Sequence, residues 1–176
     1  YEKILLDINN NYSCVSFKDY KSDFKNQTLL RHDVDFSIDN ALTISSIEKK
    51  VGVVSTYFLQ MTCDFYNLFA AESMEQIEKI ASNGHHFGIH LDPAASKVVN
   101  LNQLEEVAGI EAEVFYKYLG IKVDSISFHN PSSEILKIKD KTIVGLINAY
   151  SKDIHSSSEY CSDSNGYWRF DTIEEV

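Results

Sequence analysis

The chain has 176 residues, of which 44% are hydrophobic and 12% aromatic, and a formal net charge of −10. This length and composition predict one globular domain, residues 1–176, and exclude a disordered chain. The negative charge argues against nucleic acid and anionic membrane surfaces as main partners, because both repel an acidic protein.

The cysteines and the hydropathy of the chain indicate in which compartment it is found. The three cysteines Cys14, Cys63 and Cys161 are too widely spaced for a disulfide framework or a thiolate zinc site. The sequence contains neither an apolar run long enough to span a bilayer nor a signal-peptide pattern. We therefore expect no membrane insertion and a cytoplasmic location, unless a leader precedes Tyr1. The oligomeric state is not predictable from these features.

Strand-like and helix-like patterns alternate along most of the chain. Runs of β-branched and aromatic residues predict strands at 28–34, 53–60, 86–91 and 124–129. Apolar stripes with helical spacing predict helices at 38–50, 70–83 and 101–119. Residues 143–150 fit either a helix or a strand, and residues 151–168 are expected to be mostly loop. The alternation predicts parallel strands with right-handed crossovers, as in a barrel or a doubly wound sheet.

Two aspartates end the first expected strand. Asp33 and Asp35 are separated by one residue, so on extended backbone their side chains point to the same face. Two adjacent carboxylates repel each other, and a metal ion is a simple way to hold such a pair. The alternative is that Asp35 or Ser37 caps the helix that follows.

Two histidines lie at the ends of other expected strands. His90 alternates with apolar neighbours, and His129 ends its strand just before Asn130 and Pro131. A core histidine and a hydrogen-bonded loop histidine are the structural alternatives. Because the carboxyl ends of parallel strands lie on one rim, we expect both histidines to lie near Asp33 and Asp35. Two histidines with a carboxylate form a common ligand set for zinc or another divalent transition metal. His85 and His86 follow a helix end and are expected to be structural or surface residues.

Four short motifs occur in a characteristic order along the chain. They are Arg31-His32-Asp33-Val34-Asp35, then Ser55-Thr56-Tyr57-Phe58, then Gly84-His85-His86-Phe87-Gly88-Ile89-His90, then Ser127-Phe128-His129-Asn130-Pro131-Ser132. In this order they resemble the polysaccharide deacetylase (NodB-homology) family, over roughly residues 28–170. The resemblance is greater to a bacterial branch associated with surface-polysaccharide genes, such as those of lipopolysaccharide biosynthesis.

The resemblance implies a fold, an activity and roles for three residues. The fold would be an α/β fold, a distorted parallel (β/α) barrel related to the TIM barrel. The activity would be metal-dependent removal of an acetyl group from a sugar. By similarity, Asp33 matches the catalytic base, Asp35 the metal-binding aspartate and His90 the first metal histidine. We expect zinc, with cobalt, nickel, iron or manganese as alternatives.

The chain departs from the family pattern at two places. The family's second metal histidine is replaced by Ala94, so we expect His129 to supply the third ligand, with Asp92 as a weaker candidate. The family's late histidine, its general acid, has no counterpart before Val176. Either the acid is absent or, as we favour, the domain is incomplete at its C-terminal end. His155 is a weak alternative acid.

Further residues are expected around the site. The expected substrate contacts are Tyr57, Asn130, Asn148, Tyr150, Ser164 and Trp168, although a lone tryptophan is more often a buried anchor. The expected supporting residues are Arg31, Asp163 and Arg169, each of which otherwise fits an ordinary surface ion pair.

The resemblance leads to one main function hypothesis and two alternatives. The main hypothesis is a hydrolase that removes an N-acyl group from a sugar during surface-polysaccharide biosynthesis. One alternative is a catalytically degenerate carbohydrate-binding module on the same fold, and the other is a hydrolase acting on a different amide. These readings differ at Asp33, because only a hydrolase needs a base at that position.

Overall fold

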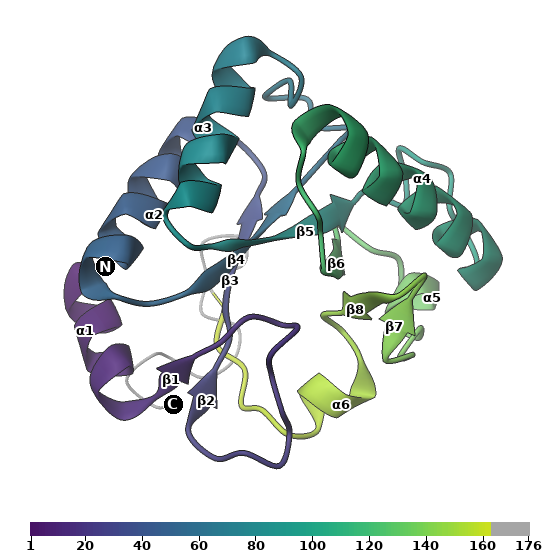
Figure 1. The fold of residues 1–176 in the computed structure, drawn as a ribbon. Helices are drawn as coiled ribbons and strands as arrows, with labels where there is room; N and C mark the ends of the chain where they lie inside the picture. Colours follow the sequence, from purple (N-terminus) through teal and green to yellow (C-terminus); the bar gives the residue numbers. More distant parts are fainter. Residues whose placement is uncertain (163–176) are drawn as a thin grey trace.

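A computed structural model of the chain describes residues 1–162. Its elements follow one another as α1 (Glu2–Asn11), β1 (Ser13–Cys14), β2 (Gln27–Thr28), β3 (Leu30–Val34), α2 (Ile38–Val51), β4 (Ser55–Leu59), α3 (Ala71–Ser82), β5 (His86–Leu91), α4 (Leu101–Leu119), β6 (Ser125–Phe128), α5 (Ser133–Leu136), β7 (Thr142–Ile143), β8 (Leu146–Asn148) and α6 (Lys152–His155) (Figure 1). The predicted strands and helices between residues 28 and 129 are confirmed within a few residues at each end.

The main sheet has six strands in the order β3-β4-β5-β6-β8-β7. The first four strands and β8 run parallel, and β7 pairs antiparallel with β8. This confirms the predicted α/β class. A closed barrel, however, is not formed by residues 1–162. The sheet is open between its edge strands β3 and β7, because it ends in an antiparallel hairpin and neither edge strand pairs with the other.

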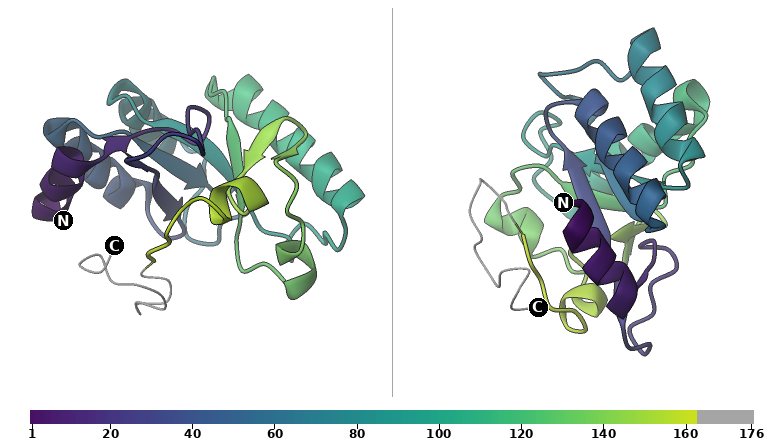
Figure 2. Two further views of the ribbon diagram at one scale, coloured as in Figure 1. Left: turned by 90° about the horizontal axis from the view of Figure 1, so that it is seen from below. Right: turned by 90° about the vertical axis from the view of Figure 1, so that its left-hand side faces the viewer.

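Helices α2, α3 and α4 form an outer layer beside the sheet, and α2 and α3 lie side by side (Figures 1 and 2). The hydroxyl of Ser37 caps α2 by accepting a hydrogen bond from the backbone N–H of Asn40, and α2 ends at Gly52 in the left-handed conformation. Ser37 is therefore the N-cap of α2, and the side chain of Asp35 is not used for capping. The core between helices and strands contains Tyr57, Leu59, Ile77, Ile89 and Phe115.

Strand alternation divides the side chains of β3 and β4 between the two faces of the sheet. His32 pairs in register with Tyr57, and both side chains point toward α2, where they meet the buried carboxylate of Glu48. Arg31 and Asp33 point to the other face, on which the guanidinium of Arg31 lies over the ring of Phe58. The motif around Asp33 therefore serves a structural network on one face and a polar site on the other.

Three regions depart from the sequence expectations. Residues 1–27 carried no predicted element and contain α1, β1 and the start of β2, and residues 133–136 form α5, where no helix was predicted. Residues 143–150, left open between helix and strand, contain a hairpin whose turn residues Val144 and Gly145 both have positive φ. No helix among residues 1–162 is long and apolar enough to cross a membrane.

Candidate metal centre

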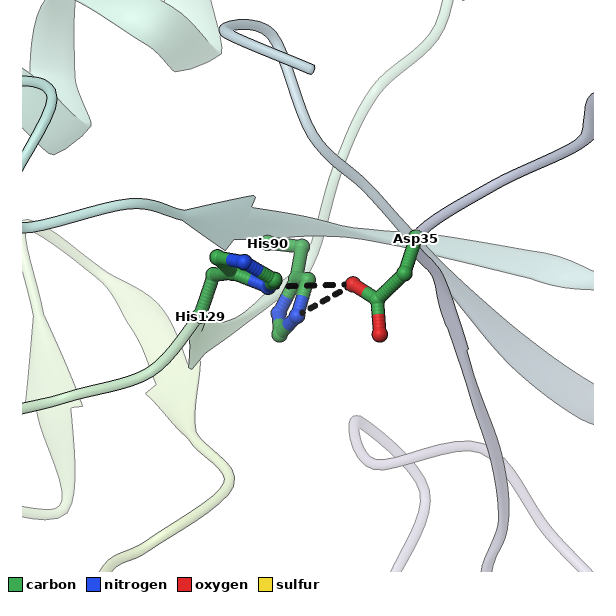
Figure 3. Close-up of side chains that lie close together, drawn as sticks. All are labelled: Asp35, His90 and His129. Carbon is green, nitrogen blue, oxygen red and sulfur yellow. Dashed lines mark hydrogen bonds and ion pairs between the residues drawn. The ribbon is translucent and has the colours of Figure 1, made fainter. Parts of the chain in front are cut away.

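Asp35, His90 and His129 bring three potential ligand atoms within 4.8 Å of one another (Figure 3). The Oδ1 atom of Asp35 lies 3.2 Å from Nε2 of His90 and 3.1 Å from Nδ1 of His129. The two imidazole rings are nearly perpendicular, with centroids 5.2 Å apart. One carboxylate and two imidazoles thus converge on one point, the donor set that suits zinc and related divalent metals.

The three residues come together because each lies at the carboxyl end of a parallel strand. Asp35 follows the last residue of β3, His90 lies next to the end of β5, and His129 follows the last residue of β6. A backbone hydrogen bond from His129 N–H to the carbonyl of Leu91 fixes the end of β6 against β5. The three side chains therefore lie together at the carboxyl ends of the strands, as the strand order predicts, and His129 lies close enough to the other two to be the third ligand.

His90 is almost fully buried, whereas the other two ligands face the surface. The side chains of His90, His129 and Asp35 are 3%, 25% and 32% exposed. The cluster is therefore buried at His90 and partly exposed at Asp35 and His129, and three protein ligands leave further coordination positions of a metal ion unfilled.

Asp33 lies next to this group and is held by Arg31. The guanidinium donates two hydrogen bonds, from Nε to Oδ1 at 2.9 Å and from an Nη to Oδ2 at 2.7 Å, a bidentate pairing. Arg31 also donates to the hydroxyl of Tyr150 at 3.1 Å and lies against the rings of Phe58 and Tyr150. These contacts pair Arg31 with Asp33 and fix the orientation of the carboxylate.

The electrostatics keep Asp33 ionised. Burial alone would raise the pKa of this carboxyl. The charges of Arg31 and His90 and the hydrogen bonds from Arg31 and Ser127 outweigh that effect, so the pKa lies below its ordinary value. Asp33 thus presents a carboxylate beside the three candidate ligands.

Asn130 contacts His129 on the side away from Asp35. Its amide nitrogen lies 2.9 Å from Nε2 of His129. Because the two ends of an asparagine amide are interchangeable, the same side chain also suits a protonated Nε2, which leaves Nδ1 as the ligand atom. Asn130, which was expected to contact a substrate, therefore lies next to the site and contacts His129.

Two of the expected substrate contacts lie elsewhere. Tyr57 is fully buried on the helical side of the sheet, where its hydroxyl donates to Glu48. Asn148 is also fully buried, and its amide donates to the carbonyls of Ile138 and Asp140. Neither side chain has exposed surface in this structure. Tyr150, by contrast, is half-buried and reaches the site through Arg31.

The remaining candidates have separate positions. Asp92 accepts hydrogen bonds from the backbone N–H groups of Ala94 and Ala95, so it stabilises a turn and is not in the three-residue cluster. His155 stacks on Tyr150, and burial lowers its pKa. Asp163, Ser164, Trp168 and Arg169 lie outside the described residues.

His85 and His86 have structural partners, as expected. His85 is buried between the backbone N–H of Ser55 and the carbonyl of Ser45, and His86 pairs with Asp124. The sequence analysis did not identify Ser127 of β6, whose hydroxyl contacts Nδ1 of His90. Ser127 precedes His129 by two positions, so strand alternation places both on the same face, and this spacing could have identified it.

The comparisons with known proteins give a fold likeness. No family model and no curated protein matches the chain. Among solved structures, the chain matches a Streptococcus pyogenes deacetylase, PplD, described in complex with acetate. The TM-score is 0.57 and the identity 14%, and the match covers 99% of this chain and 82% of that one. The chain therefore shares the fold of a deacetylase.

Proposed function

We propose that this chain is a metal-dependent hydrolase that removes an acetyl group from a sugar. The observation that carries the proposal is the convergence of Asp35, His90 and His129 beside an Arg31-bound Asp33, at the carboxyl ends of parallel strands. The fold shared with a deacetylase and the order of the sequence motifs support the same conclusion. Zinc is the expected ion.

The donor set found in the structure fits such an ion. Two imidazole nitrogens and a carboxylate oxygen would hold it at Asp35, His90 and His129, and open positions would face the exposed side of the cluster. When bound, the ion would polarise the acyl carbonyl and make a water molecule more acidic.

Asp33 is the general base in this proposal. Arg31 occupies both of its carboxylate oxygens with hydrogen bonds and holds them next to the ligands, so the carboxylate can take a proton from water as the acyl carbon is attacked. Tyr150 and its neighbours at the rim are proposed to contact the sugar. The general acid has no candidate among residues 1–162 that is better than His155.

The biological setting is also part of the proposal. The resemblance of the motifs to a branch associated with surface-polysaccharide genes suggests a substrate made during cell-surface assembly. The wide spacing of the three cysteines favours a cytoplasmic location. We also propose that the sheet belongs to a distorted barrel of the deacetylase type.

Metal content is the first test. Protein freed of metal with a chelator and then supplied with Zn²⁺ should retain about one ion per chain after dialysis, measured by elemental analysis, and Asp35→Ala and His129→Ala should lose it. A wild-type chain that retains no zinc would contradict the hydrolase proposal and favour a carbohydrate-binding module.

Asp33→Asn tests the base. Acetate release from N-acetylated oligosaccharides should fall about 10²–10⁴-fold, while zinc is retained, because the amide cannot take the proton. Asp39→Asn, at an exposed aspartate of α2, is the matched control and should behave as wild type. Wild-type turnover in Asp33→Asn would remove Asp33 from the mechanism.

A further inference from the structure

Ser127 has a buried hydroxyl that contacts both His90, a candidate metal ligand, and Asp33, the candidate base. It lies on β6 directly opposite His90 of β5, with no exposed surface. Its Oγ is 2.7 Å from Nδ1 of His90 and 3.4 Å from Oδ1 of Asp33. A single side chain thus bridges a candidate metal ligand and the candidate base.

The chemistry of the three groups fixes the direction of both hydrogen bonds. Ser127 Oγ is the donor in its hydrogen bond to Oδ1 of Asp33, so the hydroxyl hydrogen points to Asp33. The oxygen of Ser127 is then left to accept from Nδ1–H of His90. With its proton on Nδ1, His90 presents the lone pair of Nε2 to the side where Asp35 lies, 3.2 Å away.

We propose that Ser127 is a positioning residue that holds His90 in the tautomer and ring orientation needed for metal binding and ties that ligand to Asp33. The inference rests on the proposed metal-dependent function and adds a residue to it. A hydroxyl is required, because only a group that donates and accepts at once can join a ring N–H to a carboxylate. Partners of this kind, behind the ligands, commonly change metal affinity about 10–100-fold when removed.

Ser125 shows that burial on β6 does not by itself create this role. It lies two positions earlier on the same face and is equally buried. Its hydroxyl donates to the carboxylate of Asp124 instead, at 3.0 Å. Ser125→Ala is therefore a control matched to Ser127→Ala in substitution, strand, face and burial.

Zinc affinity, measured by competition with a chromophoric chelator, is the main test and requires no turnover. Ser127→Ala should bind Zn²⁺ about 10–100-fold more weakly than wild type, and Ser125→Ala within about twofold. The visible absorption spectrum of the Co²⁺-loaded protein is a second readout. It should change in Ser127→Ala and stay the same in Ser125→Ala, because a reoriented His90 changes the ligand field.

Folding of each variant is checked by circular dichroism. If Ser127→Ala does not fold, Ser127→Cys keeps the shape of the side chain at a somewhat larger size and replaces the hydroxyl with a weak thiol donor, and the same weakening is expected. Equal zinc affinity and equal Co²⁺ spectra in wild type and the Ser127 variants would overturn this inference and leave the hydrolase proposal standing. Failure of wild type to bind zinc would overturn both.

Discussion

At the scale of single residues, Glu48 is the buried charge whose partners are best defined. Its carboxylate has no exposed surface and accepts hydrogen bonds from the hydroxyls of Tyr1 and Tyr57, while Oε1 lies 2.6 Å from Nε2 of His32. Burial raises the pKa of Glu48, but these hydrogen bonds and the charge of His32 lower it by more, from 4.5 to about 2. Glu48 therefore stabilises the fold in its ionised form.

This shift predicts a loss of stability in acid. Because the folded pKa lies below the unfolded one, the contribution is complete above about 4.5 and is lost as the pH falls toward about 2. It amounts to roughly 3 kcal/mol at most. The free energy of unfolding in urea should thus fall more steeply between about pH 5 and pH 2 in wild type than in Glu48→Gln. Glu75→Gln, at an exposed position of α3, should keep the wild-type profile. Parallel profiles for wild type and Glu48→Gln would show that Glu48 is not ionised in the fold.

Site residues were predictable from the sequence where a metal-binding or acidic residue type stands at the end of a predicted strand. Asp35, His90 and His129 follow from polar residues at the ends of parallel strands. The positions of Tyr57 and Asn148 did not follow, because a motif does not say which face of the sheet its members occupy. The register of Tyr57 with His32, and not with Asp33, places it on the helical side. Ser127 was missed because a small polar residue in a strand looks like a space-filling residue.

At the scale of elements, Gly88 of β5 allows the sheet to pack at its centre. A Cβ atom at Gly88 would overlap the ring of Phe58 and lie 2.8 Å from Oγ of Ser125. Both neighbours belong to adjacent strands, on the face that carries His90. The packing of β4 and β6 against β5 therefore requires a residue without a side chain at position 88.

Gly88→Ala should accordingly destabilise the protein by about 1–3 kcal/mol, as overpacking does. Gly109 is the matched control, because a Cβ there meets nothing within 4 Å in the middle of α4. Gly109→Ala should be stabilising by about 0.5–1 kcal/mol, since alanine is the better helix former. Chemical denaturation of both variants measures the difference, and a tolerated Gly88→Ala would mean that Phe58 can move aside.

Elements with a clear hydrophobic period were predictable, and the short ones were not. The helices and strands from residue 28 to residue 129 carry several apolar residues each and agree with the structure. The β7–β8 hairpin was ambiguous because its turn has Val144 at a φ of 45°, a conformation that a β-branched residue rarely adopts. The sequence period also cannot show whether a parallel sheet closes, since closure depends on how the two edge strands meet.

At the scale of the whole molecule, the candidate ligands join distant parts of the chain. Asp35 and His129 are 94 positions apart, and with His90 they come from the ends of three different strands. An unfolded chain cannot hold these groups together, so an ion bound by all three should stabilise the folded state over the unfolded one.

Zinc should therefore raise the melting temperature. Free Zn²⁺ at one hundred times its Kd contributes about 2.7 kcal/mol, which corresponds to roughly 5–10 °C for a domain of this size. Differential scanning fluorimetry of chelator-treated protein, with and without Zn²⁺, measures the shift. His129→Ala should lose it, whereas His86→Ala should keep it, because His86 pairs with Asp124 and is not in the three-residue cluster. An equal shift in wild type and His129→Ala would place the stabilising ion elsewhere on the protein and remove the link between this site and the stability of the fold.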